Sequence, residues 1–143
     1  MEDEEANPLL IYLEDPSPDG FLRLRQAAIT SPDYAPYSND LDTALDLIDG
    51  KKWVEAREYL YKRMGNWLLS PRVHGMLAYT FKQTEETDQA ELEIGLSTLL
   101  LEGILSTGDG TQAQPFLVCR TEDEYDVLDY LGKESRDQRL LKQ

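Results

Sequence analysis

Residue types that perform catalysis or bind metals are scarce in this sequence. It contains one cysteine, Cys119, and one histidine, His74. Cys119 ends the apolar run Phe116–Cys119, which predicts a buried and inert thiol, whereas a nucleophilic cysteine would need a histidine partner. His74 falls on an expected helix with no motif around it, so we expect it to have a packing or surface role. These residues predict a protein that is not an enzyme, and a single cysteine excludes a disulfide within the chain.

The stretch closest to a ligand-binding loop is GDGT, residues 108–111. A calcium loop needs acidic oxygens at alternate positions and a glutamate at the twelfth. Counted from Asp109, the twelfth position is Arg120. A phosphate-binding loop needs a lysine after its last glycine, and none follows here. The stretch therefore predicts a tight turn, and we expect no metal and no cofactor.

Acidic residues form two clusters that could bind a basic protein. In the first cluster, the even helical spacing does not suggest a catalytic pair, and acids near a helix N-terminus interact favourably with its dipole. The first cluster is thus either a solvated helix end or a docking surface, and the second contains no histidine or cysteine, so any metal there would need all-oxygen ligands. Trp67 and Arg72 are further binding candidates, because aromatic residues and arginine dominate binding hot spots. We expect Trp67, near a helix end, to be partly exposed and Trp53 to be in the core. The acidic candidates are Glu85, Glu86, Asp88 and Glu91 in the first cluster, and Glu122, Asp123, Glu124 and Asp126 in the second.

The charge is strongly negative and unevenly distributed. The chain carries 28 acidic and 14 basic side chains, for a net charge of −14. Residues 1–50 hold 12 acids and 2 bases, and residues 85–129 hold 12 acids and 1 base, whereas residues 51–84 hold 2 acids and 7 bases. This balance argues against a nucleic-acid partner, which needs a basic face. It is compatible with a basic protein partner, or simply with solubility.

A 34-residue repeat indicates which elements carry these residues. Small residues recur where two helices approach closely, and large apolar residues recur where the space between helices is filled. This is the period of the tetratricopeptide repeat, a helical hairpin that usually forms part of a surface for holding a partner. The repeated pairs are Ala44 and Ala78, Leu47 and Phe81, Ala56 and Ala90, and Leu60 and Ile94.

The pattern predicts a single, mostly α domain over residues 8–143, after a disordered acidic N-terminus at residues 1–7. Expected helices run from Pro8 to Glu14, from Phe21 to near Thr30, from about Leu41 to Gly50, from Lys51 to about Trp67, from Ser70–Pro71 to about Lys82, and from Asp88 to about Leu105. A small antiparallel β element is expected at about residues 115–131. Its first part, Phe116–Arg120, is typical of a strand. Residues 125–131 fit either a second strand or a short helix, and we favour the strand.

The N-terminus has an acidic start and an apolar run of only five residues, Leu9–Leu13, unlike a secretory signal. No stretch approaches the roughly 20 apolar residues of a membrane-spanning helix. We therefore expect a cytoplasmic protein with no membrane partner.

About three quarters of the chain, from Phe21 to Leu131, resembles the uncharacterised bacterial family named domain of unknown function 4919. The resemblance rests on FLRLRQAAITSPDYAPY (residues 21–37), ALDLIDGKKWVEA (residues 44–56), and ILSTGDGTQAQPFLV (residues 104–118) followed by DEYDVLDYLG. It implies a tetratricopeptide-like helical body with a small C-terminal β element. The family has no assigned activity, so the resemblance does not indicate one for this chain.

The function that these observations favour is non-catalytic protein binding, through the first helix of each hairpin, near Asp40–Asp49 and Arg72–Lys82. A sharper hypothesis is an immunity protein that neutralises a basic toxin through its acidic surface. Two alternatives remain open. One is a structural or regulatory subunit that self-associates through the apolar segment Glu93–Leu105, and the other is an enzyme with an acidic cleft. The oligomeric state is left undecided.

Overall fold

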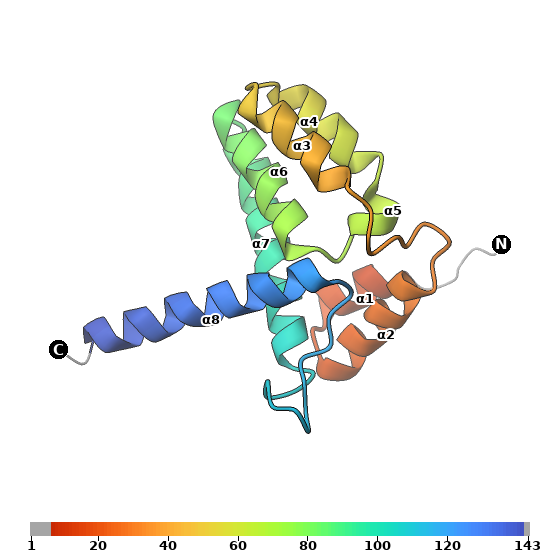
Figure 1. The fold of residues 1–143 in the computed structure, drawn as a ribbon, viewed down its shortest axis with the longest axis vertical. Coiled ribbons are helices and arrows are strands. Elements are labelled where there is room, and N and C mark those ends of the chain that lie inside the picture. The colour runs from red at the N-terminus through yellow and green to blue at the C-terminus, as the bar shows by residue number, and fades with distance from the viewer. Residues whose placement is uncertain (1–6, 142–143) are drawn as a thin grey trace.

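The computed structural model describes residues 7–141, with side chains up to Gly132 in the last helix. The expected disorder of residues 1–7 lies almost wholly outside this part. The described chain is all-helical (Figure 1), which confirms the mostly α prediction. The helices are α1 (Pro8–Glu14), α2 (Pro18–Ile29), α3 (Asp40–Asp49), α4 (Trp53–Tyr61), α5 (Met64–Trp67), α6 (Pro71–Gln83), α7 (Thr87–Leu105) and α8 (Thr121–Leu141).

The β element expected at about residues 115–131 does not form in the described chain. Residues 115–118 have no regular structure, and α8 begins at Thr121. Side chains replace the strand partner, because Leu117 N donates to Thr107 Oγ1 and Val118 O accepts from Arg25. Three acidic residues in the first turn of α8 favour a helix N-terminus there.

Helices α3 and α4 form one antiparallel hairpin, and α6 and α7 form a second, with α4 packed against α6. Corresponding boundaries lie 34 residues apart: α3 ends at Asp49 and α6 at Gln83, and α4 starts at Trp53 and α7 at Thr87. Three backbone hydrogen bonds of the first turn recur 34 residues later in the second. In the first turn, Lys51 N donates to Ile48 O, Lys52 N to Leu47 O, and Ala56 N to Lys52 O. In the second turn, Glu85 N donates to Lys82 O, Glu86 N to Phe81 O, and Ala90 N to Glu86 O.

Both connecting turns also contain a residue in the left-handed region. Lys51 and Glu85 each have φ of 61°. Of the repeated residues, the four alanines, Leu60 and Phe81 are buried, whereas Leu47 is half-buried and Ile94 is exposed. The 34-residue period is therefore a repeat of backbone structure as well as of sequence.

The single helix expected from Lys51 to Trp67 is divided into α4 and α5 by a turn at Lys62–Arg63. This turn redirects the chain so that Trp67 enters the hairpin core. That core contains Leu41, Ala44, Leu60, Trp67, Val73 and Leu77.

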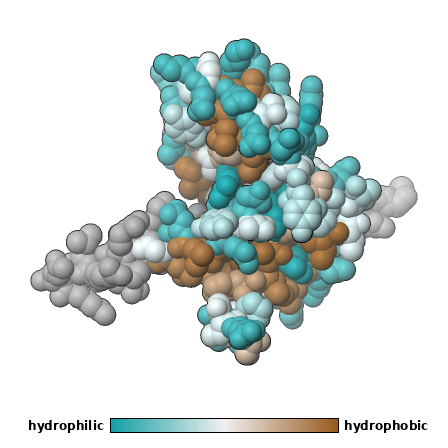
Figure 2. Space-filling view, in the orientation of Figure 1, coloured by the Kyte–Doolittle hydropathy of each residue, from teal (hydrophilic) through white to brown (hydrophobic). Residues whose placement is uncertain are grey.

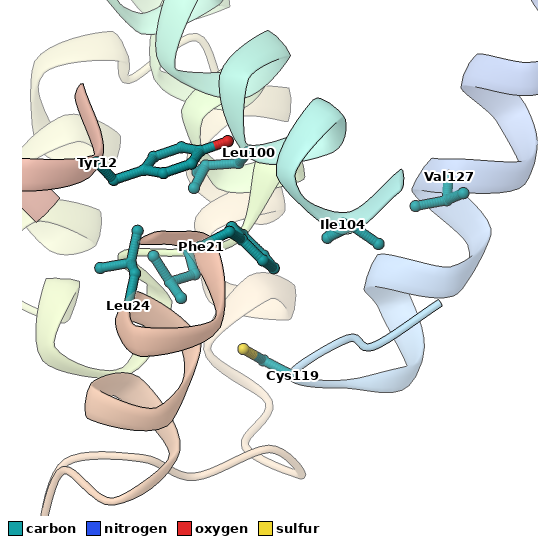
Figure 3. Packing of buried hydrophobic residues seen from close by; sticks show 8 residues of the cluster. Tyr12, Phe21, Leu24, Leu100, Ile104, Cys119 and Val127 are labelled. Atoms are coloured by element: carbon teal, nitrogen blue, oxygen red, sulfur yellow. The ribbon is translucent and has the colours of Figure 1, made fainter. Parts of the chain in front are cut away.

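A second core surrounds the C-terminal half of α7 (Figure 3). Helices α1 and α2 pack on one side of it, and α8 closes it from another. Gly103 allows the closest approach, because a Cβ atom there would lie 2.3 Å from Cδ1 of Phe21. The apolar half of α7 is thus covered within the chain. The residues of this second core are Tyr12, Phe21, Leu24, Leu69, Leu100, Ile104, Cys119 and Val127.

Helix α8 crosses the N-terminal end of α6 and extends away from the rest of the body (Figure 1). Within the described residues, no helix has both the length and the apolar character needed to cross a bilayer.

Candidate protein-binding surface

The two acidic clusters lie on different parts of the molecule. Glu85 and Glu86 belong to the turn between α6 and α7, and Asp88 and Glu91 to the first turns of α7. That turn is at the upper end of the hairpins, whereas α8, which carries the second cluster, starts near the middle of the body (Figure 1). The clusters therefore do not merge into one acidic surface.

The first cluster is exposed but partly engaged within the fold. Glu86 pairs with the buried Arg57, at 3.3 Å between Oε2 and Nη2, and accepts from Thr84 at 2.6 Å. Arg57 also stacks 4.4 Å from the centre of the Phe81 ring and donates to Thr80 O at 3.0 Å. Glu86 thus helps to close the hairpin, while Asp88 and Glu91 are exposed to solvent.

The expected exposure of Trp67 is wrong. Its side chain is 0% exposed, and its Nε1 donates to Asp40 Oδ2 at 2.9 Å. Trp53, expected in the core, is instead half-buried and packs edge-on against the exposed Tyr79. A partner therefore cannot touch Trp67 in this conformation, whereas the Trp53–Tyr79 pair is at the surface.

The second cluster contains acids that make contacts within the fold, such as Asp123 and Asp126, and acids that are more accessible to solvent. Asp123 is 1% exposed, and its Oδ2 accepts from Cys119 N at 3.1 Å. Burial raises the pKa of Asp123 to about 6. Asp126 accepts two hydrogen bonds from Arg72, at 2.9 and 3.1 Å. Burial raises the pKa of Asp126 as well, although the Arg72 guanidinium opposes the rise.

Two of the predicted site residues, Arg72 and Asp126, are thus brought together across 54 positions of sequence. Asp123 and Asp126 attach α8 to the body. Glu122 is half-buried and Glu124 is exposed, so Glu124 is the most accessible acid of this cluster.

Sequence reasoning missed Arg120, which fixes the segment leading into α8. Its buried guanidinium lies 4.1 Å from the Trp67 ring centre, and Nη2 donates to Asn66 O at 2.5 Å. The Tyr34 hydroxyl donates to the carbonyl oxygen of the neighbouring Cys119. Arginine stacked on a buried tryptophan is a long-range contact for which the local sequence carries no signal.

The only histidine, His74, and the only cysteine, Cys119, are both buried in the fold. His74 is buried, with Nδ1 2.6 Å from Glu93 Oε1 and Nε2 2.7 Å from Leu68 O. Tyr61 donates to the other oxygen of Glu93 at 2.6 Å. Burial alone would raise the pKa of Glu93, but the hydrogen bonds from His74 and Tyr61 outweigh it and hold the pKa below its usual value.

Both ring nitrogens of His74 therefore face acceptor oxygens within the protein, so neither is available to a substrate. Burial, followed by the charge of Asp123, raises the pKa of the Cys119 thiol to about 11. At neutral pH Cys119 is then almost entirely protonated and poorly nucleophilic.

An apolar groove, which we call the α8 groove, lies between the 110–118 segment and the first turns of α8. Its volume is about 300 Å³. Tyr125 and Leu128 are each 63% exposed, and Leu131, one further step of three along the helix, is 38% exposed. Such spacing places these residues on one face of a helix. The groove is lined by Gly110, Pro115, Phe116, Val118, Glu124, Tyr125, Val127 and Leu128.

This part of the molecule presents hydrophobic surface between α8 and the loop that projects at the bottom of the view (Figure 2). The groove could have been found from sequence by assigning residues 121–131 to a helix, because the acids Glu122–Glu124 are typical of a helix start. The strand interpretation instead placed Tyr125 and Leu128 on opposite faces.

The fold and its surface define an all-helical class of protein with a duplicated hairpin, an apolar groove, and an acidic exterior. Within the described residues, no group of three or more His, Cys, Asp or Glu side chains is placed to hold a metal ion. Comparison of the chain with protein-family models, curated proteins and solved structures gave no match.

Proposed function

We propose that this protein is a non-catalytic protein-binding module built on two tetratricopeptide-like hairpins. The observation that carries the proposal is the duplicated hairpin, whose boundaries and turn hydrogen bonds repeat after 34 residues. Stacked units of this period generally form surfaces that hold a partner. The engaged nitrogens of His74 and the raised pKa of Cys119 support a role without catalysis.

The net charge of −14 favours a basic protein as the partner. The first helices of the hairpins contribute exposed residues that include Asp42, Asp46 and Asp49 on α3 and Tyr79 on α6. The sharper form of the proposal is an immunity protein that neutralises a cognate basic toxin. The resemblance to domain of unknown function 4919 is compatible with a tetratricopeptide-like scaffold and adds no activity.

The test is to purify the tagged chain from its source cells, identify a stoichiometric partner, and reconstitute the complex from purified components. Calorimetry should give a Kd that weakens by about tenfold or more between about 0.05 and 0.5 M salt, because exposed charges are screened over this range. If the partner is a toxin, one equivalent of this protein should abolish its activity. Absence of a stoichiometric partner would contradict the binding function, and a salt-independent Kd would contradict its electrostatic part.

A self-associating subunit is the second candidate, favoured by the exposed Leu92 and Ile94 on α7. These two residues lie in the N-terminal half of α7, whereas its apolar C-terminal half is covered by α1, α2 and α8, which leaves little of that helix for a second copy. Light scattering at two protein concentrations separates the candidates. A constant monomer mass would remove self-association.

A further inference from the structure

We infer that the α8 groove is the docking site for a cationic amphipathic helix of a protein partner. The inference rests on the proposed protein-binding function and names the part of the partner that is recognised.

The apolar floor of the groove suits a helix. Tyr125 and Leu128 line the groove, and Leu131 continues their stripe beyond it, so that the stripe covers six residue steps or about 9 Å along the axis of α8. The 110–118 segment supplies the facing wall through Phe116 and Val118. A partner helix that docks in such a groove uses apolar anchors three or four residues apart. A volume of about 300 Å³ accommodates a few such side chains rather than a large ligand.

The charges around the stripe select a basic helix. With successive residues 100° apart, Glu124 lies on one side of Tyr125 and Leu128, and Glu122 lies on the other. Of the acids on this part of α8, Asp123 is buried and Asp126 pairs with Arg72, so Glu122 and Glu124 flank the stripe. Asp109 adds an exposed carboxylate in the adjacent loop, where hydrogen bonds from Thr111 lower its pKa. Lysines or arginines flanking the apolar anchors of a partner helix would meet Glu122, Glu124 and Asp109.

Both walls of the groove are held in place before any partner arrives. The Arg72–Asp126 pair and the buried Asp123 hold α8, and the Arg25 hydrogen bonds to Val118 O, at 3.0 and 3.2 Å, hold the 110–118 segment. Gly110 has φ of 84°, and a Cβ atom there would lie 2.9 Å from the Phe116 ring. A preformed groove reduces the ordering that binding would otherwise require.

The test uses a fluorescein-labelled synthetic peptide of about 18 residues, or five helical turns, made of leucine and lysine in amphipathic order. Anisotropy titrations with the full chain should show saturable binding. Leu128→Ala should weaken binding by about tenfold. Leu92→Ala is the matched control, because the exposed fraction of Leu92 on α7 is 64%, compared with 63% for Leu128. It should leave the affinity unchanged.

Two further peptides test the chemistry of the site. A leucine–glutamate peptide in the same order should bind at least tenfold more weakly, because its charges repel the flanking acids. A scrambled leucine–lysine peptide should also bind more weakly, because it lacks an apolar face. Glu124→Gln should weaken binding of the leucine–lysine peptide. Glu91→Gln, which changes an exposed acid on α7, should leave this binding unchanged.

The inference is overturned if the leucine–lysine peptide does not bind, if Leu128→Ala and Leu92→Ala behave alike, or if the scrambled peptide binds equally well. Dimerisation that disappears in Leu128→Ala would also overturn it and would assign the groove to a second copy of the chain. These outcomes are distinct from failure of the proposed function. A natural protein partner that still binds the Leu128→Ala variant removes the groove inference and leaves the binding function intact.

Discussion

At the scale of single residues, buried and partly buried charged side chains connect the last helix to the body. Arg120 stacks on Trp67, Asp123 accepts from the backbone at Cys119, and Asp126 pairs with Arg72. Buried charges of this kind contribute little net stability but are costly to leave without a partner. They therefore restrict how α8 can sit, and with it the shape of the α8 groove.

Trp67 is the residue on which sequence and structure differ most, and its substitution gives a direct test. Trp67→Phe should lower the free energy of unfolding by about 2–4 kcal/mol, because it opens a cavity and removes the donor to Asp40. Trp53→Phe, at a half-buried surface position, should lower it by less than about 1 kcal/mol. Urea denaturation measures both changes.

Fluorescence gives a second readout from the same two proteins. Trp53→Phe leaves Trp67 as the only tryptophan, so its emission should resist acrylamide quenching. Trp67→Phe leaves the more accessible Trp53, which should be quenched more strongly. Equal quenching in the two variants would show that Trp67 is not buried in solution.

Asp123 makes stability depend on pH in an unusual direction. Its pKa is about 6 in the folded protein and 3.8 ordinarily, so between these values the folded state binds more protons than the unfolded state. The free energy of unfolding should therefore rise as the pH falls from about 7 to about 4, by up to about 3 kcal/mol for this group. The lowered pKa of Glu93 acts in the opposite direction, but only near and below its usual value of 4.5.

Asp123→Asn is the control for this titration, because the amide oxygen can still accept from Cys119 N while the charge is removed. Its free energy of unfolding should change less between pH about 7 and about 5 than that of the natural protein. Asp126, whose pKa is also raised by burial, is present in both proteins and contributes to both profiles. Parallel pH profiles for the two proteins would show that Asp123 does not carry the effect.

At the scale of elements, the two hairpin turns should respond alike to the same substitution. Lys51 and Glu85 are exposed and have φ of 61°, which is unfavourable for a residue with a side chain. Lys51→Gly and Glu85→Gly should each raise the free energy of unfolding by about 0.5–1 kcal/mol. Lys52→Gly, next in the chain with φ of −94°, should lower it. Thermal unfolding of the three variants measures these changes, and opposite effects at Lys51 and Glu85 would contradict the equivalence of the turns.

The elements that sequence predicted well are those with local boundary signals. Pro8 opens α1, and Ser70 caps α6 by accepting from Val73 N, with Pro71 in the first turn. The end of α3 before Gly50 was also predicted. Helix α8 was missed because the apolar run before it suggested a strand, and that run is stabilised by side chains from α2 and from the segment after α7.

The candidate surface was predicted less completely, for a related reason. Charge and residue type identified Arg72, Asp126 and Glu124, but their surroundings depend on contacts between distant segments. Local sequence cannot distinguish Asp123, which is buried, from its exposed neighbour Glu124. The pairing of Arg72 with Asp126 and the stacking of Arg120 on Trp67 require the tertiary fold.

At the scale of the whole molecule, the net charge of −14 on 143 residues should oppose folding by mutual repulsion. Sodium chloride shortens the range of this repulsion, from about 30 Å at 0.01 M to about 8 Å at 0.15 M. Ion pairs such as Arg57–Glu86 and Arg72–Asp126 are partly exposed, so their weakening by salt should be smaller than the relief of repulsion. The balance predicts that added salt stabilises the folded protein.

The corresponding measurement is the unfolding temperature between about 0.01 and 0.15 M sodium chloride, which should rise with salt. A matched variant with Glu58→Lys and Glu91→Lys changes two exposed acids and takes the net charge from −14 to −10, because each replacement adds two charges. This variant should unfold at a higher temperature than the natural protein in low salt and respond less to added salt. An unfolding temperature that falls with salt, or an equal response in both proteins, would mean that local ion pairs outweigh the overall repulsion. The acidic exterior would then place no net burden on folding.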